Sequence, residues 1–312
     1  KEIWCITGES KDELQASLVL HLEARKLTAS KGGARYTPAD LAKLAEGIRA
    51  ATGRAEATFG AGSAIPLHKV LDLLKRASSV CRIADVHDPR RAGTGFLVNG
   101  AELLPPRDGM LVLTNHHVLH GAEADDALLD SDDYRGSIDV ERAQAEFYYW
   151  DGAPALKTIK IEKILDYSPR NKSDFALASL KEPVPATVAL PLSHSVKPLG
   201  SRNHRSADRR AKVIVIGYPN GGELSFSVSD NEVVDHELDD APREPPRRIH
   251  YRAPTEPGSS GSPVFHHETL EVVGLHRSGS VGPLRPDWPR VRNDEKYEAN
   301  EAVSLRSIRE CL

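Results

Sequence analysis

The chain has 312 residues, of which 39% are hydrophobic and 28% are charged. This balance is typical of a globular protein with a substantial core, and the length fits two or three compact units. The 41 basic and 45 acidic residues give a formal net charge of −4, which argues against nucleic acid or an anionic membrane as the main partner.

Hydropathy and cysteine content narrow the class of protein further. No apolar run approaches the roughly 20 residues of a membrane-spanning helix, so no membrane partner is expected. The three cysteines, Cys5, Cys81 and Cys311, lie far apart in the sequence. A disulfide-linked secreted scaffold is therefore not expected, and a reducing, cytoplasmic location is favoured.

Residues 1–77 are expected to form a helical extension, because apolar residues recur there at helical spacing. Three such sets are present: Leu14, Leu18 and Leu22; Leu41, Leu44 and Ile48; and Leu67, Val70, Leu71 and Leu74. Thr37 and Pro38 precede the second set as a helix cap and a first-turn proline. Two roles are open for this extension: a cap that stabilises the rest of the chain, or a docking unit for a regulatory protein.

From about residue 79 to 302, short β-type runs alternate with polar turns. Many short strands at this spacing indicate an all-β sandwich or a pair of barrels. The predicted strands are 80–84, 95–98, 111–114, 146–150, 158–164, 175–180, 212–218, 223–228, 262–265 and 271–275. Exposed charged loops are expected at 121–136, 201–212 and 229–247, and a C-terminal helix at about 302–311.

The segment 255–265 carries the strongest chemical signal. It reads Thr-Glu-Pro-Gly-Ser-Ser-Gly-Ser-Pro-Val-Phe, a glycine-rich turn around Ser260 that leads into a β-type run. The glycines let the backbone bend so that the N–H groups of Gly258 and Ser260 point into one hole. Two such donors stabilise the oxyanion that forms when a hydroxyl attacks a carbonyl carbon.

A serine hydroxyl needs a neighbouring base, and the base needs an orienting acid. His117 lies at a polar step in the β-type run 111–119. Asp174 immediately precedes the apolar strand predicted at 175–180, where its carboxylate would be partly buried and able to hold an imidazole. The sequence therefore predicts His117 as the base, Asp174 as the orienting acid and Ser260 as the nucleophile.

Five segments together resemble one known family. They are 93–98 (GTGFLV), 114–118 (TNHHV), 174–177 (DFAL), 258–263 (GSSGSP) and 273–279 (VGLHRSG). Over roughly residues 80–310 the chain is similar to the chymotrypsin/trypsin-like serine peptidases. It resembles in particular the bacterial, disulfide-free branch that includes the glutamyl (V8-like) endopeptidases.

The resemblance implies a mainly β fold of two six-stranded antiparallel barrels, with the active site in the cleft between them. Barrel one would span about 78–184, barrel two about 185–302 and a C-terminal helix about 303–311. The implied activity is that of a serine endopeptidase with no cofactor. His117, Asp174 and Ser260 would be catalytic, and the backbone N–H groups of Gly258 and Ser260 would form the oxyanion hole.

The resemblance also bears on the residue before the cut. No aspartate stands at Pro254, where members that cut after Lys or Arg have one. Thr255 and His276 fall where glutamyl endopeptidases bind an acidic side chain, so a Glu or Asp preference is expected, with a small aliphatic residue as the rival. The expected pocket wall continues through three further residues, Arg277, Ser278 and Gly279.

Several alternatives accompany this interpretation. Ser259 stands where members activated through a new N-terminus have aspartate, so that activation is not expected. His116, His117 and His120 lie close in sequence, but further ligands at suitable spacing are missing, so no metal site is predicted. A peptidase-fold binding module that no longer cuts is the alternative function. By analogy with bacterial relatives that carry helical extensions, a role in signalling or antiviral defence is a further expectation.

Overall fold

The computed structural model describes nine segments of the chain: residues 65–103, 105–124, 129–150, 153–184, 189–192, 211–228, 231–236, 247–279 and 299–312. The chain divides into two units, Lys1–Leu67 and His68–Leu312. The helices predicted around residues 14–22 and 37–48 lie outside the described residues.

The third predicted helix is confirmed as α3 (Leu67–Ala77). Its buried residues are Leu73 and Ala77, whereas Val70, part of the predicted apolar stripe, is 38% exposed. The buried residues of the helix therefore lie in its C-terminal half and are not those of the predicted stripe. Lys75 and Arg76 lie in the last turn, where positive charge stabilises the helix dipole.

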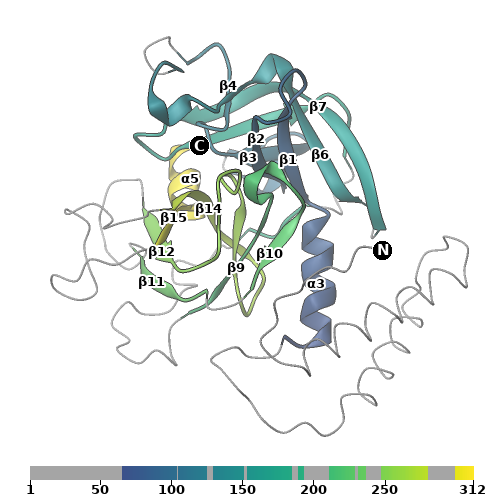
Figure 1. The fold of residues 1–312 in the computed structure, drawn as a ribbon, viewed down its shortest axis with the longest axis vertical. Coiled ribbons are helices and arrows are strands. Elements are labelled where there is room, and N and C mark those ends of the chain that lie inside the picture. Colours follow the sequence, from purple (N-terminus) through teal and green to yellow (C-terminus); the bar gives the residue numbers. More distant parts are fainter. Residues whose placement is uncertain are drawn as a thin grey trace, which may run out of the picture. The chain divides into compact units, whose positions relative to one another are not determined.

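The first half of the unit is a closed antiparallel barrel, in the order β1-β2-β3-β8-β7-β6. Its strands are β1 (Val80–Asp85), β2 (Ala92–Asn99), β3 (Met110–Thr114), β6 (Ala143–Trp150), β7 (Ala153–Ser168) and β8 (Phe175–Leu180). Buried side chains such as Ile83, Val112 and Ile161 fill its interior. Figure 1 shows these strands in blue and teal. Closure pairs both edges of the sheet and leaves no open strand.

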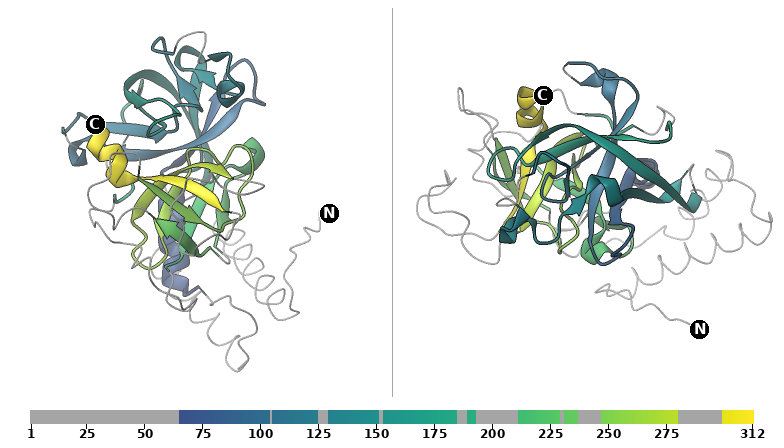
Figure 2. Two further views of the ribbon diagram at one scale, coloured as in Figure 1. Left: turned by 90° about the vertical axis from the view of Figure 1, so that its left-hand side faces the viewer. Right: turned by 90° about the horizontal axis from the view of Figure 1, so that it is seen from above.

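The second half is a seven-stranded sheet in the order β10-β9-β13-β14-β15-β12-β11. Its strands are β9 (Val213–Gly217), β10 (Ser225–Ser227), β11 (Val233–His236), β12 (Arg248–Tyr251), β13 (Pro263–His266), β14 (Val272–Gly279) and β15 (Asn300–Ser304). An isolated antiparallel bridge between Lys212 and Glu232 links the start of β9 to the start of β11. The sheet therefore curves into a half-barrel, and this bridge connects its two sides. Figure 2 shows its strands in green and yellow.

The expected mainly β, two-barrel architecture is confirmed, but the predicted positions of several strands and of the C-terminal helix were wrong. β11 lies inside the expected loop 229–247, and β15 occupies the start of the expected C-terminal helix, so that α5 begins only at Leu305 and ends at Cys311. β12 and two short strands, β4 (Leu119–His120) and β5 (Ile138–Asp139), were not predicted. The physical reason is clearest for β12 and β15, which bury charged side chains against each other: Arg248, His250 and Glu301.

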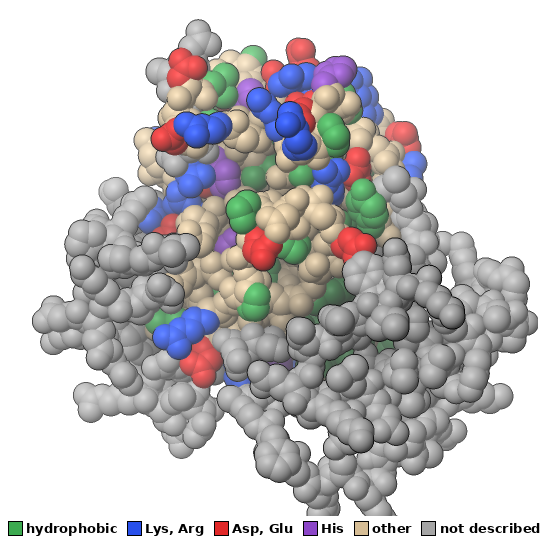
Figure 3. All heavy atoms as spheres, in the orientation of Figure 1, with side chains coloured by type: hydrophobic (Ala, Val, Ile, Leu, Met, Phe, Trp, Pro, Cys, Tyr) green, Lys and Arg blue, Asp and Glu red, His purple; other side chains and the backbone are tan. Residues whose placement is uncertain are grey.

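The surface of the described residues shows charges of both signs. On the face seen in Figure 3, basic and acidic side chains are intermixed over the first barrel. No continuous basic patch is visible among the described side chains of that face. None of the helices that the structure describes is long and apolar enough to cross a lipid bilayer.

Candidate active site

Strand register brings the predicted base and acid together. β3 pairs with β8, with Thr114 opposite Ala176, so the residues that follow β3 lie beside those that precede β8. Asn115 Nδ2 donates a hydrogen bond of 2.8 Å to the backbone oxygen of Asp174 and ties the two ends together. His117 lies just beyond this link.

The carboxylate of Asp174 holds His117 at two points. His117 Nδ1 lies 2.9 Å from Asp174 Oδ2, and the backbone N–H of His117 donates to Oδ1 at 3.2 Å. Asp174 is fully buried and has a positive φ of 45°, a left-handed conformation that is uncommon outside glycine. Because Nδ1–H donates to the carboxylate, Nε2 carries the lone pair and can act as a base.

Asp174 stays ionised in spite of its burial. Burial alone would raise its pKa, but the charge and hydrogen bond of His117, followed by the charges of Arg277 and Arg170, lower the pKa to about 2. A carboxylate that is charged throughout the physiological range can stabilise a protonated imidazole.

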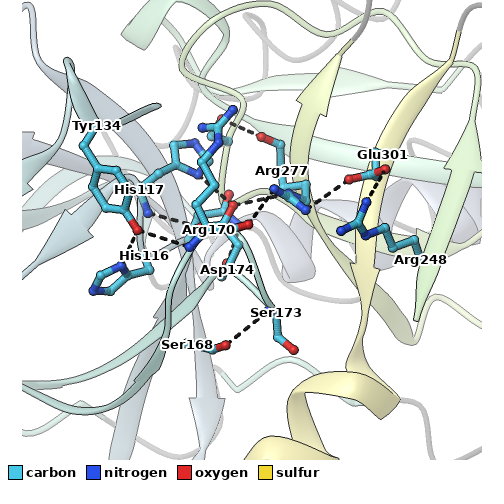
Figure 4. Close-up of polar contacts among 12 residues, drawn as sticks. His116, His117, Tyr134, Ser168, Arg170, Ser173, Asp174, Arg248, Arg277 and Glu301 are labelled. Atoms are coloured by element: carbon cyan, nitrogen blue, oxygen red, sulfur yellow. Dashed lines mark hydrogen bonds and ion pairs between the residues drawn. The ribbon is translucent and has the colours of Figure 1, made fainter. Parts of the chain in front are cut away.

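Arg277 is the residue that the sequence did not assign to this role. Its side chain is only 4% exposed and contacts two buried carboxylates: Nε lies 3.3 Å from Asp174 Oδ2, and Nη1 lies 3.2 Å from Glu301 Oε1. Its Nη2 donates a hydrogen bond of 2.8 Å to the backbone oxygen of Arg170. Figure 4 shows the guanidinium between Asp174 and Glu301, and Glu301 also contacts Arg248. The Arg277 side chain, which was expected in the pocket wall, thus contacts the aspartate that was predicted to be catalytic.

Ser260 lies in the half-barrel, in the turn before β13. Its Oγ donates a 3.4 Å hydrogen bond to the backbone oxygen of Arg277. Among the described residues no hydrogen bond joins Ser260 to His117. Arg277 links the three predicted residues, since its backbone oxygen accepts from Ser260 and its side chain contacts Asp174, which holds His117.

A hydrogen bond to the preceding residue sets the direction of the Gly258 N–H group. The backbone oxygen of Pro257 accepts a hydrogen bond from the N–H of Asn220. In a trans peptide the C=O and the following N–H point in opposite directions, so the Gly258 N–H faces away from Asn220. The φ of Gly258 is +92°, a conformation that suits glycine. Within the described residues no hydrogen bond from this N–H is present, as the predicted role in an oxyanion hole requires.

Thr94 on β2 anchors the turn around Ser260 from the first barrel. Its N–H donates to the backbone oxygen of Ser260 at 2.8 Å, and its Oγ1 donates to that of Gly258 at 2.9 Å. Thr114 Oγ1 donates to the Thr94 backbone oxygen at 2.6 Å. Gly261 passes so close that a Cβ there would overlap this same oxygen. Thr94 belongs to the motif at 93–98, but its contacts with the turn were not predicted from the sequence.

The expected specificity residues form a second polar cluster. Thr255 Oγ1 donates to Asn300 Oδ1 at 2.8 Å, and a Cβ on Gly279 would lie 2.7 Å from the same oxygen. His276 Nδ1 lies 2.6 Å from the hydroxyl of Tyr251. Burial, and then the nearby charge of His117, lower the pKa of His276 to about 3, so this imidazole is neutral. Asn300 and Tyr251 were not predicted, and Ser278 is half-buried beside them.

The histidines considered for a metal site have other contacts. His116 Nδ1 lies 2.6 Å from Tyr134 Oη and its Nε2 lies 3.1 Å from Glu123 Oε1, while His117 is held by Asp174. In the described part of the chain, no three His, Cys, Asp or Glu residues are grouped so that they could hold a metal ion.

The chain matches one family of known proteins. Residues 93–275, more than half of the chain, match the profile of the trypsin-like peptidase domain. No curated protein sequence matches significantly. Among solved structures, the active form of the Rv3671c protease from M. tuberculosis is 17% identical, with a TM-score of 0.47, covering 82% of this chain and 93% of that one. A serine endoprotease from Yersinia pestis is 13% identical, with a TM-score of 0.44, covering 79% and 66%.

Proposed function

Because the chain belongs to the trypsin-like peptidase family, we propose that it is a serine endopeptidase that hydrolyses a protein substrate through an acyl-enzyme. The observation that carries this proposal is the pair of hydrogen bonds from His117 to the buried carboxylate of Asp174, next to the turn of Ser260. An imidazole oriented by a buried carboxylate beside a serine turn is the arrangement that serine acyl transfer requires.

The proposed reaction uses the chain's own groups and no cofactor. Rotation of the Ser260 side chain would break its weak bond to the Arg277 oxygen and bring Oγ to His117. Oγ attacks the peptide carbonyl while its proton passes to Nε2 of His117. The same proton then goes to the leaving amine, and water hydrolyses the ester by the reverse path. Asp174 stays ionised and stabilises the imidazolium.

Two backbone donors complete the proposed mechanism. The N–H groups of Gly258 and Ser260 would bind the oxyanion of the tetrahedral intermediate. Each donor of this kind contributes roughly 3–4 kcal/mol to transition-state stabilisation in comparable enzymes. Thr94 supports the proposal because it hydrogen-bonds the carbonyl groups on both sides of the turn.

The finer assignments are proposals of the same kind. A place in the V8-like branch, with cleavage after Glu or Asp, is supported by the positions of Thr255 and His276, and a small aliphatic preference remains the rival. The neutral state of His276 counts against charge pairing with an acidic residue. Binding of a regulatory protein through residues 1–77, a cytoplasmic location and a role in bacterial signalling or antiviral defence rest on the sequence alone.

A second function has one observation in its favour. Since the Ser260 hydroxyl bonds the backbone of Arg277 and not His117, the chain could be a latent enzyme or a peptidase-fold binding module. A module of this kind would have no use for the buried Asp174–His117 pair.

Labelling with a fluorophosphonate separates these functions. The endopeptidase predicts covalent labelling of the folded full-length protein that disappears in Ser260→Ala and falls strongly in His117→Ala. Ser262→Ala is the matched serine control and should retain the label. A folded protein that takes up no label would contradict the active enzyme and favour the module.

A further inference from the structure

We propose that the cluster of Thr255, His276 and Asn300 selects a carboxamide side chain, glutamine or asparagine, before the cut. This inference rests on the proposed peptidase function and names its substrate class. It differs from the acidic preference expected from sequence because the hydrogen atoms in the cluster are placed for an amide.

His276 presents a donor. Tyr251 is fully buried, and within the described residues the only hydrogen bond of its hydroxyl is the one to His276 Nδ1. A buried hydroxyl donates its proton when an acceptor is at hand, so Tyr251 donates to Nδ1. The neutral imidazole therefore carries its hydrogen on Nε2. This nitrogen has no hydrogen-bond partner within the described residues, so its hydrogen remains for a ligand.

The charge state of His276 follows from its whole surroundings. Burial lowers its pKa most, and His117, which follows β3, lowers it further. Glu301 on β15 acts in the opposite direction, and Tyr251 on β12 stays protonated because burial, and then Glu301, raise its pKa. With a pKa of about 3, the imidazole supplies a hydrogen bond and no positive charge for a carboxylate.

Thr255 presents an acceptor. Asn300 Nδ2 donates to the backbone oxygen of Ala253 at 2.6 Å, which fixes the orientation of the amide and turns Oδ1 toward Thr255. The Thr255 hydroxyl must then donate its single proton to Oδ1 at 2.8 Å. Only the lone pairs of the Thr255 oxygen remain for a ligand.

The two groups lie on one side of the half-barrel. β12 pairs with β15 and β15 with β14, with Tyr251 opposite Asn300, Asn300 opposite Gly279, and His276 opposite Ala302. The Tyr251 and His276 rings contact each other edge to face with centroids 6.1 Å apart, and a Cβ on Gly279 would lie 3.7 Å from Thr255 Oγ1. Gly279 has no side chain and is exposed, which leaves this approach open.

A carboxamide satisfies both groups at once. Its carbonyl oxygen accepts from His276 Nε2–H, and its NH₂ donates to Thr255 Oγ1. A carboxylate has no hydrogen for Thr255, so two oxygens with facing lone pairs would meet, and the neutral imidazole would not compensate the lost hydration of the charge. An aliphatic side chain would leave both groups unpaired.

A cleavage profile of the full-length protein on a proteome-derived peptide mixture tests the inference, with Ser260→Ala as the background. We expect Gln or Asn before the cut to exceed Glu, Asp and Val by about tenfold or more, since one well-placed hydrogen bond is worth about that factor. Any profile without this enrichment, an empty one included, overturns the inference. Fluorophosphonate labelling reports separately on the peptidase, so labelled protein with an acidic profile would overturn the carboxamide preference alone.

Two variants locate the preference in these residues. Thr255→Val removes the acceptor and should reduce the kcat/KM ratio of Gln to Glu peptides by about tenfold, while Thr255→Ser should restore it. Tyr251→Phe frees Nδ1 and should reduce the same ratio, with Tyr148→Phe, an exposed tyrosine, as the matched control. An unchanged ratio in Thr255→Val would refute the assignment even if Tyr251→Phe fails to fold.

Discussion

Arg277→Met should destabilise the protein more than any loss of a surface charge. Methionine keeps much of the apolar stem of arginine and removes the guanidinium. The guanidinium contacts Asp174 and Glu301, whose side chains are 0% and 6% exposed, and it donates one hydrogen bond to the Arg170 backbone. Its removal would leave two buried carboxylates with fewer counter-charges.

The expected size follows from these contacts. Removal of one partner from a buried ion pair costs about 3–5 kcal/mol, because the remaining charge stays buried and uncompensated. Glu301 keeps His250 and Arg248 within 3.4 Å, and Asp174 keeps His117, which reduces the cost. The contacts of Arg277 with both carboxylates lack hydrogen-bond alignment, which also favours the lower part of this range. We therefore expect about 3 kcal/mol.

Urea unfolding at neutral pH, in a Ser260→Ala background that prevents self-cleavage, measures this cost. Arg135→Met is the matched control, since Arg135 and Asp132 form an ion pair whose side chains are 82% and 87% exposed and should contribute less than about 1 kcal/mol. Adding Glu301→Gln to Arg277→Met should recover part of the loss. If Arg277→Met costs no more than the control, the central role of the guanidinium is refuted.

Three further predictions concern the same site. Gly261→Ala should abolish folding, because a Cβ would overlap the Thr94 oxygen at a φ of +89°, while Gly136→Ala, with open space around it, should behave as wild type in thermal melts. Thr94→Val should lower kcat at least about tenfold with little change in KM, because it releases the Gly258 carbonyl of the oxyanion turn; an unchanged kcat would contradict this. The pKa of Asp174 falls from 3.8 to about 2 on folding, so its contribution of about 2 kcal/mol is present above about pH 4 and is lost as the pH falls toward 2. The difference in unfolding free energy between the Ser260→Ala protein and its Asp174→Asn derivative should shrink by that amount over this range, and a constant difference would count against it.

Much of the fold could be predicted from local pattern. Strands β3 and β8 are largely apolar runs, and their positions follow directly from the sequence. β12 and β15 could not be found in this way, because their charged residues are neutralised only by each other once the strands pair. A short stretch of sequence around Arg248 or Glu301 contains charged residues and is predicted to be exposed.

The sequence by itself determined which reactive groups are present: a glycine-rich turn at Ser260, a histidine at the end of one strand and an aspartate at the start of another. These signals are local, since each depends on a few neighbouring residues. The tertiary structure alone decided what surrounds them, including Arg277 at Asp174 and the placement of hydrogens on His276 and Thr255. These contacts join separate strands, and a register shift of one residue would turn every such side chain to the opposite face of its sheet.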